Sequence, residues 1–176
     1  LFKAYSRVAG SADLSQAQET AIKHNLRDFK LSGIDLPDKE KKRYAEIRQR
    51  LSELTTKFSE NVMDATQGWE KLITDEKALA GMPEMALAAA KQAAESKELK
   101  GYLLTLEFPS YFPVMTHCDD RELRKEVYEA YATRASDQGP NAGKWDNSDI
   151  MQEILTLRKE MSALLGFSSY AAYSVA

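Results

Sequence analysis

The chain has 176 residues, of which 43% are hydrophobic and 29% are charged, so it is long enough and apolar enough to fold around a core of its own. A net charge of −3 gives no electrostatic basis for binding nucleic acid or an anionic membrane surface, and no apolar run approaches the roughly 20 residues of a membrane-spanning helix. The single cysteine, Cys118, excludes an internal disulfide and favours a reducing compartment.

Both ends of the chain have the pattern of amphipathic helices. The first residues show apolar side chains at helical spacing without a preceding cap, and residues 157–176 indicate a helix, a stop at Gly166 and the start of another helix. We interpret the chain as a segment of a longer polypeptide whose terminal helices have lost neighbours. This interpretation predicts self-association through exposed apolar side chains. These are Leu1, Phe2, Tyr5, Val8, Phe167, Tyr170 and Tyr173.

The next two segments are also predicted to be helices. Ile22, Leu26 and Phe29 mark one helical face, and Gly33 is expected to end that helix. Pro37 then stands near the first position of a second helix, where its missing N–H costs nothing.

The second of these helices is expected over residues 37–64, and its apolar side chains recur at steps of three and four residues. The stripe predicts a core-facing helix in which Leu51 and Leu54 are buried. The alternative is a surface that binds a helix of another protein. The stripe consists of Tyr44, Ile47, Leu51, Leu54, Phe58 and Val62.

Two short segments rich in aromatic and branched residues, about 69–73 and 102–108, are predicted to be strands. Because a lone two-stranded ribbon is marginally stable, we expect it to pack on helices. Between the strands we expect a helical turn capped by Thr74 or Asp75 and an alanine-rich helix opened by Pro83.

The remainder of the chain is predicted to be helical apart from a long loop over residues 137–147. A short helix over 110–117 precedes one that Asp119 or Asp120 caps, and Asn147 or Ser148 is expected to cap the next. The fold class is therefore mainly α, a helical bundle-like segment with a small two-stranded ribbon. The predicted inward residues after the caps are Leu123, Val127, Tyr128 and Tyr131, and then Ile150, Ile154, Leu157, Met161 and Leu164.

Few residues suggest chemistry. His24 and His117 are the only histidines, and neither belongs to an HExxH motif, in which two histidines one helical turn apart bind one zinc ion. Cys118 follows His117, but a nucleophilic cysteine needs a base, and only His24 would be available. The sequence His117-Cys118-Asp119-Asp120 collects four ligand types, yet neighbouring helical residues point about 100° apart and do not converge on one ion.

Two other patterns have a simpler explanation. The segment Gly139–Lys144 differs from a phosphate-binding loop in its glycine spacing and lacks the preceding strand, so we interpret it as a loop between helices. The acidic pairs Asp75-Glu76 and Asp119-Asp120 fit helix starts, where the helix dipole favours negative charge. The residues alone therefore predict no catalytic, cofactor-binding or metal-binding residue.

Several segments, taken together and in this order, resemble the thimet-oligopeptidase family of zinc metallopeptidases. The pairs GY…TL…PSY…PVM and LR…LLGF…Y recur across that family. The matching segments are LRDFKLSGIDLP at 26–37, RLSELTTKFSENVMDAT at 50–66, LITDEKALAGMPEMAL at 72–87, GYLLTLEFPSYFPVMTHCDDRELR at 101–124, YATRASDQGPNAGKWDN at 131–147 and LRKEMSALLGFSSYAAY at 157–173.

The resemblance implies a clamshell of helical halves around a narrow channel that admits short peptides. Residues 1–176 would form one helical segment of the N-terminal half, and the zinc-binding HExxH region would lie after Ala176. The resemblance thus implies a cytoplasmic peptidase in which this segment is a wall of the channel, inactive alone and binding no zinc. The alternatives are a helical interaction scaffold without enzymatic activity and an independent enzyme that uses Cys118 or the residues around His117.

Overall fold

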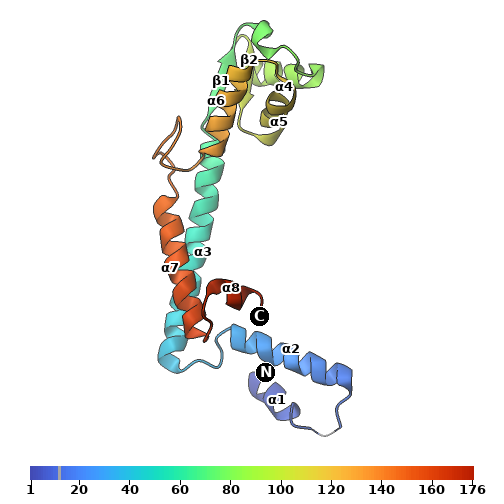
Figure 1. Ribbon diagram of the computed structural model, residues 1–176, viewed down its shortest axis with the longest axis vertical. Helices are drawn as coiled ribbons and strands as arrows, with labels where there is room; N and C mark the ends of the chain where they lie inside the picture. The colour runs from blue at the N-terminus through green and yellow to red at the C-terminus, as the bar shows by residue number, and fades with distance from the viewer. Residues whose placement is uncertain (12) are drawn as a thin grey trace. The chain divides into compact units, whose positions relative to one another are not determined.

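The computed structural model describes residues 1–11 and 13–176, which form eight α-helices, one short 3-10 helix and one two-stranded antiparallel sheet (Figure 1). This content confirms the predicted fold class. Contacts within the chain divide it into two compact units. Unit 1 comprises Leu1–Thr55 and Gln152–Ala176, and unit 2 comprises Thr56–Met151.

In its described part, unit 1 consists of helices and the loops that connect them. Ser15 begins the second helix through a capping box: its Oγ accepts a hydrogen bond from the N–H of Gln18, and the Gln18 side chain accepts one from the N–H of Ser15. That helix ends just before Gly33, as predicted. The elements are α1 Phe2–Val8, α2 Gln16–Leu31, the first part of α3 Asp38–Gln67, the last part of α7 Ser148–Leu164, and α8 Tyr170–Ser174.

The apolar stripe of α3 faces the interior of unit 1 only in part. Leu54 is buried, as predicted, but Leu51 is half-buried, so the prediction for Leu51 was too strong. Leu51 lines an open pocket on the side of α3, described below, which leaves it partly in contact with solvent. The buried hydrophobic side chains of unit 1 are Ile22, Tyr44, Ile47, Leu54, Leu157 and Met161.

The terminal side chains divide into two groups. Leu1 is 90% exposed and Val8 45% exposed, in line with the prediction for these two. The aromatic rings differ from the prediction, because all five are half-buried and pack on other rings of unit 1. The ring contacts are Phe2–Phe29, Tyr5–Phe29, Phe167–Tyr173 and Tyr170–Tyr173, with centroids 5.7–6.0 Å apart.

Unit 2 contains the sheet and the helices around it. Asp75 caps the 3-10 helix and Asp120 caps α6, each through a side-chain oxygen that accepts backbone N–H hydrogen bonds. The strands pair in antiparallel register, with Glu70 opposite Thr105 and Ile73 opposite Tyr102. Besides the parts of α3 and α7 that fall in this unit, its elements are β1 Glu70–Ile73, η1 Glu76–Leu79, α4 Glu84–Glu95, β2 Tyr102–Thr105, α5 Phe108–His117 and α6 Arg121–Ala132.

The core of unit 2 lies between the sheet and helices α4, α5 and α6. Leu123 and Val127 of α6 point into it, as predicted, but Tyr128 is 54% exposed, which contradicts the prediction for that residue. Ala130 completes the buried face of α6 instead, since residues 123, 127 and 130 share one side of a helix. The core comprises Trp69, Ile73, Leu79, Met82, Ala90, Leu104, Leu106, Val114, Cys118, Leu123, Val127 and Ala130.

Some element boundaries differ from the prediction. The second strand ends at Thr105 rather than residue 108, because the Thr105 N–H donates to Ser110 Oγ at 3.0 Å and α5 begins at Phe108. Helix α3 continues to Gln67, past the predicted end at residue 64. Asn147 stands directly before α7, where its carbonyl oxygen accepts from the N–H of Met151 at 2.8 Å, and its buried side chain hydrogen-bonds to Asn61 and to the Phe58 carbonyl within unit 2.

Candidate functional site

The residues that the sequence singled out for chemistry belong to both units. His24 is exposed on α2 in unit 1, and His117 is exposed at the C-terminal end of α5 in unit 2. Cys118 is buried, and its Sγ atom lies 3.5 Å from the carbonyl oxygen of Ala78. Burial raises the pKa of the Cys118 thiol, which disfavours the nucleophilic thiolate. Its surroundings are therefore those of a core residue.

The acidic residues that follow Cys118 serve the start of α6. Asp120 Oδ1 accepts hydrogen bonds from the N–H groups of Glu122 and Leu123 at 2.9 and 3.1 Å, which confirms its predicted role as a cap. Within residues 1–11 and 13–176, no three His, Cys, Asp or Glu side chains are grouped so that they could hold a metal ion. Among these described residues, no such group fits the zinc ion that the resemblance implies.

The loop before α7 does not form an anion-binding cradle. Three of its backbone N–H groups, from Ala142 to Lys144, donate to carbonyl oxygens of the same loop at 3.0–3.2 Å. A phosphate-binding loop instead directs several N–H groups at the ligand. Lys144 Nζ lies 4.1 Å from the centre of the Trp145 ring. These contacts support the interpretation of Gly139–Lys144 as a connecting loop.

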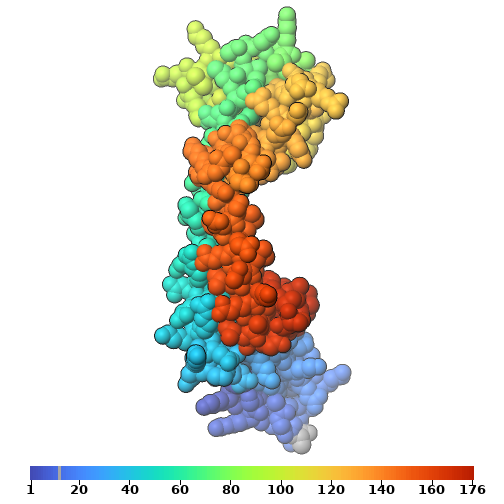
Figure 2. All heavy atoms as spheres, turned by 60° about the vertical axis from the view of Figure 1, so that its left-hand side comes forward, coloured from blue at the N-terminus to red at the C-terminus, as the bar shows by residue number. Residues whose placement is uncertain are grey.

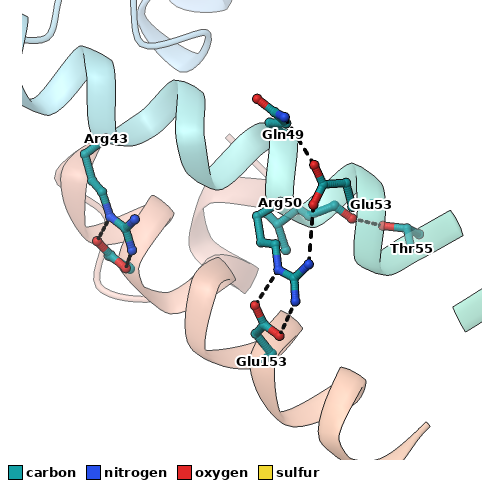
Figure 3. Close-up of polar contacts among 8 residues, drawn as sticks. Arg43, Gln49, Arg50, Glu53, Thr55 and Glu153 are labelled. Carbon is teal, nitrogen blue, oxygen red and sulfur yellow. Dashed lines mark hydrogen bonds and ion pairs between the residues drawn. The ribbon is translucent and has the colours of Figure 1, made fainter. Parts of the chain in front are cut away.

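Two arginines of α3 are neutralised by glutamates of α7 (Figure 3). Arg43 binds Glu160 through Nε and Nη2 at 2.6 and 2.8 Å, and Arg50 binds Glu153 in the same bidentate way at 2.7 and 2.9 Å. The hydrogen bonds from Arg50 and Arg43 lower the pKa of the Glu153 and Glu160 carboxyl groups. These side chains are occupied with each other and connect α3 to α7 inside unit 1.

A different pair of arginines lines a pocket in the same unit. The chain reverses after α7 at Gly166, whose φ of +82° is easily adopted only by glycine. Ser169 then caps α8, which brings Tyr170 and Tyr173, one helical turn apart, back to α3 and α7. Figure 2 shows this last segment in dark red beside α7. We call the resulting cavity of about 280 Å³ the Arg–Tyr pocket; it is lined by Arg48, Leu51, Ser52, Thr55, Arg158, Met161, Tyr170 and Tyr173.

The arginines of this pocket contact aromatic rings rather than carboxylates. Arg48 Nη1 lies 3.4 Å from the hydroxyl oxygen of Tyr44, whose own O–H donates to the carbonyl of Leu31 at 3.0 Å. The guanidinium of Arg158 lies 4.8 Å from the centre of the Tyr170 ring. In the part of the chain that the structure describes, neither arginine has a carboxylate within 4 Å.

A larger groove of about 640 Å³ also lies in unit 1. Its floor is apolar and includes Ile22, Leu26 and Phe167, while Lys23 and Arg27 stand among its lining residues. The groove therefore combines apolar side chains with charged ones from α2. Sequence reasoning identified neither cavity, because each combines residues of helices that are distant in the chain.

Comparison with known proteins confirms the resemblance to oligopeptidases. Residues 114–176 match the profile of Peptidase family M3. The whole chain is 62% identical to oligopeptidase A of Escherichia coli and 62% identical to oligopeptidase A of Haemophilus influenzae. It is also 42% identical, over its whole length, to a probable cytosolic oligopeptidase A of Arabidopsis thaliana. The chain covers 26% of the length of each of these three relatives.

Proposed function

We propose that this chain is a non-catalytic segment of a zinc metallo-oligopeptidase that hydrolyses short peptides, and that it forms part of the wall of the peptide channel. The observation that carries the proposal is the 62% identity to oligopeptidase A along the whole chain. The sequence contains no HExxH motif, so we propose that the zinc ligands and the catalytic base belong to the larger remainder of such a protein. Residues 1–176 would limit the size of the substrate, and none of them would act as a catalytic, cofactor-binding or metal-binding residue.

The proposal is tested by exchanging segments. The matching segment of the E. coli oligopeptidase A is replaced by this chain, and hydrolysis of a short peptide is measured with and without a metal chelator. We expect the chimera to hydrolyse the peptide in a chelator-sensitive manner, and the purified 176-residue chain to show no turnover. Zinc-dependent hydrolysis by the chain alone, or a folded chimera without activity, would contradict the proposal.

The alternative function, a scaffold that binds a partner helix, finds little support in unit 1. It relied on the apolar stripe of α3 being available to another protein. Tyr44, Ile47 and Leu54 of that stripe are at most 5% exposed, so other parts of this chain already cover them. An independent enzyme built on Cys118 is disfavoured by the burial of that thiol.

We further infer that the longer protein acts on peptides in the cytosol. One relative is described as a probable cytosolic oligopeptidase A, although another plant relative is described as organellar. Among the described residues, no helix combines the length and apolar character needed to cross a membrane. Fractionation of cells that express the full-length protein, followed by peptidase assays on each fraction, tests this inference.

Self-association of the isolated chain also remains our proposal. Leu1 and Val8 present apolar side chains to solvent, and the large groove of unit 1 adds further apolar surface. We expect light scattering to detect dimers or larger species at high protein concentration. A strict monomer under these conditions would contradict the proposal.

A further inference from the structure

We propose that the Arg–Tyr pocket binds a peptide carboxylate, with Arg48 and Arg158 as the charged contacts. That a carboxylate is the ligand follows from the side chains of the pocket; that it belongs to a peptide rests on the proposed function.

The first argument is the contrast between two sets of arginines in unit 1. Arg43 and Arg50 each bind a glutamate through two N–H groups, the geometry in which guanidinium and carboxylate match best. Arg48 lies on α3 and Arg158 on α7, the two helices that these Arg–Glu pairs connect. Among the described residues, neither Arg48 nor Arg158 forms an ion pair with a carboxylate. A guanidinium carries five N–H donors, and the one contact from Arg48 to Tyr44 uses one of them.

The second argument is that the remaining walls suit a carboxylate and the group beside it. Met161 is buried and Leu51 is half-buried, so one side of the pocket is apolar and strengthens a charge-assisted hydrogen bond. Tyr170 and Tyr173 supply neutral aromatic side chains to the pocket wall, and burial together with the neighbouring Tyr44 hydroxyl raises the pKa of Tyr173, so no negative charge from this residue opposes an anion. The glutamates of unit 1 that approach α3 from α7, Glu153 and Glu160, are bound to Arg50 and Arg43 and do not line the pocket.

The size of the pocket limits what can bind. A volume of about 280 Å³ lies just below the usual range for whole small-molecule sites, about 300–1,000 Å³. It accommodates a carboxylate with one adjoining side chain and leaves the remainder of a peptide outside. The stacking of Arg158 on Tyr170 fixes that guanidinium without neutralising it, so its charge remains available to the ligand.

The experiment compares two probes that differ only at the carboxylate. The 176-residue chain is titrated with an N-acetylated alanyl-alanyl-phenylalanine as the free acid and with the same peptide as its C-terminal amide, and binding is followed by calorimetry. We expect the acid to bind at least about tenfold more tightly than the amide, because the acid alone makes charge-assisted hydrogen bonds. Equal affinities for acid and amide would overturn the proposal.

Variants then locate the binding. Arg48→Gln and Arg158→Gln should each weaken acid binding by about tenfold and leave amide binding unchanged, whereas the matched controls Arg43→Gln and Arg50→Gln should leave both unchanged. Circular dichroism checks that each variant is folded. Loss of acid binding in the controls to the same extent, or acid binding that survives both pocket variants, would overturn the proposal. So would inorganic phosphate that displaces the acid at equal affinity, because it would identify a general anion site.

Failure of this inference is distinguishable from failure of the proposed function. A chimera that hydrolyses peptides while acid and amide bind the chain equally would reject the pocket alone. If the chain binds the acid more tightly than the amide but the folded chimera is inactive, the peptidase role is rejected and the carboxylate-binding site is retained.

Discussion

Unit 1 and unit 2 are stabilised by different kinds of contact. In unit 2, a continuous cluster of buried side chains joins the sheet to α4, α5 and α6. In unit 1, fewer hydrophobic side chains are buried, the aromatic rings near both ends are half-buried, and exposed Arg–Glu pairs connect α3 to α7. Burial of apolar surface supplies most folding free energy, whereas exposed ion pairs supply little. Unit 2 should therefore be the more stable part of this chain.

The two units also differ in the character of their cavities. The large groove and the Arg–Tyr pocket are in unit 1, whereas a cavity of about 370 Å³ in unit 2 is lined by side chains of both charges, among them Lys71 and Glu126, which bind each other. A region with incomplete burial keeps charged and aromatic groups accessible, and these are the groups that recognise a partner. The following predictions test whether the two units differ as this comparison requires, beginning with the largest effect.

The first prediction compares one leucine from each unit. Leu104 is 1% exposed in the core of unit 2, and Leu51 is half-buried in unit 1. Leu104→Ala should lower the free energy of unfolding by about 2–5 kcal/mol, because it removes buried methyl groups and leaves a cavity. Leu51→Ala should cost only about 1 kcal/mol, since its side chain is already partly hydrated. Urea denaturation followed by circular dichroism measures both, and equal losses would contradict the comparison.

The second prediction uses two glycines with nearly the same backbone conformation. Gly81 in unit 2 has a φ of +85° and Gly166 in unit 1 a φ of +82°. A Cβ atom at Gly81 would collide with the backbone carbonyl oxygen of His117, whereas nothing lies within 4 Å of one at Gly166. Gly166→Ala should cost about 1–2 kcal/mol, from the left-handed backbone alone.

Gly81→Ala should cost about 1–3 kcal/mol more than Gly166→Ala, because the added Cβ atom also collides with the carbonyl oxygen of His117. The difference between the two variants in urea denaturation isolates that collision, since the backbone strain is common to both. If both variants lose the same free energy of unfolding, the backbone around Gly81 accommodates the added methyl group without cost, which would contradict the prediction.

The third prediction concerns the buried polar pair of unit 2. Asn61 Nδ2 donates to Asn147 Oδ1 at 2.8 Å, and Asn147 Nδ2 donates to the carbonyl oxygen of Phe58 at 3.2 Å. Asn147→Ala should cost about 1–3 kcal/mol, because it removes the acceptor of the buried Asn61 Nδ2 and the donor to the Phe58 carbonyl oxygen. The Asn61→Ala variant and the double variant complete a cycle, and an interaction energy near zero would contradict the pairing.

The sequence predicted the elements better than their contacts. The caps at Asp75 and Asp120 follow from residue type, and the α3 stripe follows from its period. Which face of a helix is buried depends on the elements that pack against it. The predictions for Leu51 and Tyr128 were wrong because the sequence does not identify those neighbours. The bond from Thr105 to Ser110 that shortens the second strand is likewise a contact that no local pattern encodes.

The Arg–Tyr pocket could not be predicted from the sequence. Arg48 belongs to α3, Arg158 to α7 and Tyr173 to α8, and only the reversal at Gly166 brings the last of these back to the others. The spacing of Tyr170 and Tyr173 by one helical turn was visible, but nothing in the sequence distinguished Arg48 from the glutamate-bound Arg50 two residues later. Which arginine finds a carboxylate is decided by which face of α3 meets α7.

The last and smallest predicted effect tests the surface pairs of unit 1. The pKa of Glu153 and that of Glu160 are lowered by their bonds to Arg50 and Arg43, so the folded state favours the ionised carboxylates. Their contribution to stability is therefore complete above pH 4.5, the ordinary pKa of glutamate, and is lost as the pH falls through the lowered pKa values.

The double variant Glu153→Gln/Glu160→Gln should be slightly less stable than the original chain at neutral pH. Below the lowered pKa values the two should be equally stable. Thermal denaturation at a series of pH values measures the difference. The matched control is Glu95→Gln on α4 of unit 2, since Glu95 forms no ion pair with the described residues. A difference that persists unchanged in acid would show that the glutamates act through packing, and the contrast between a core-held unit 2 and a partly charge-held unit 1 would then be wrong.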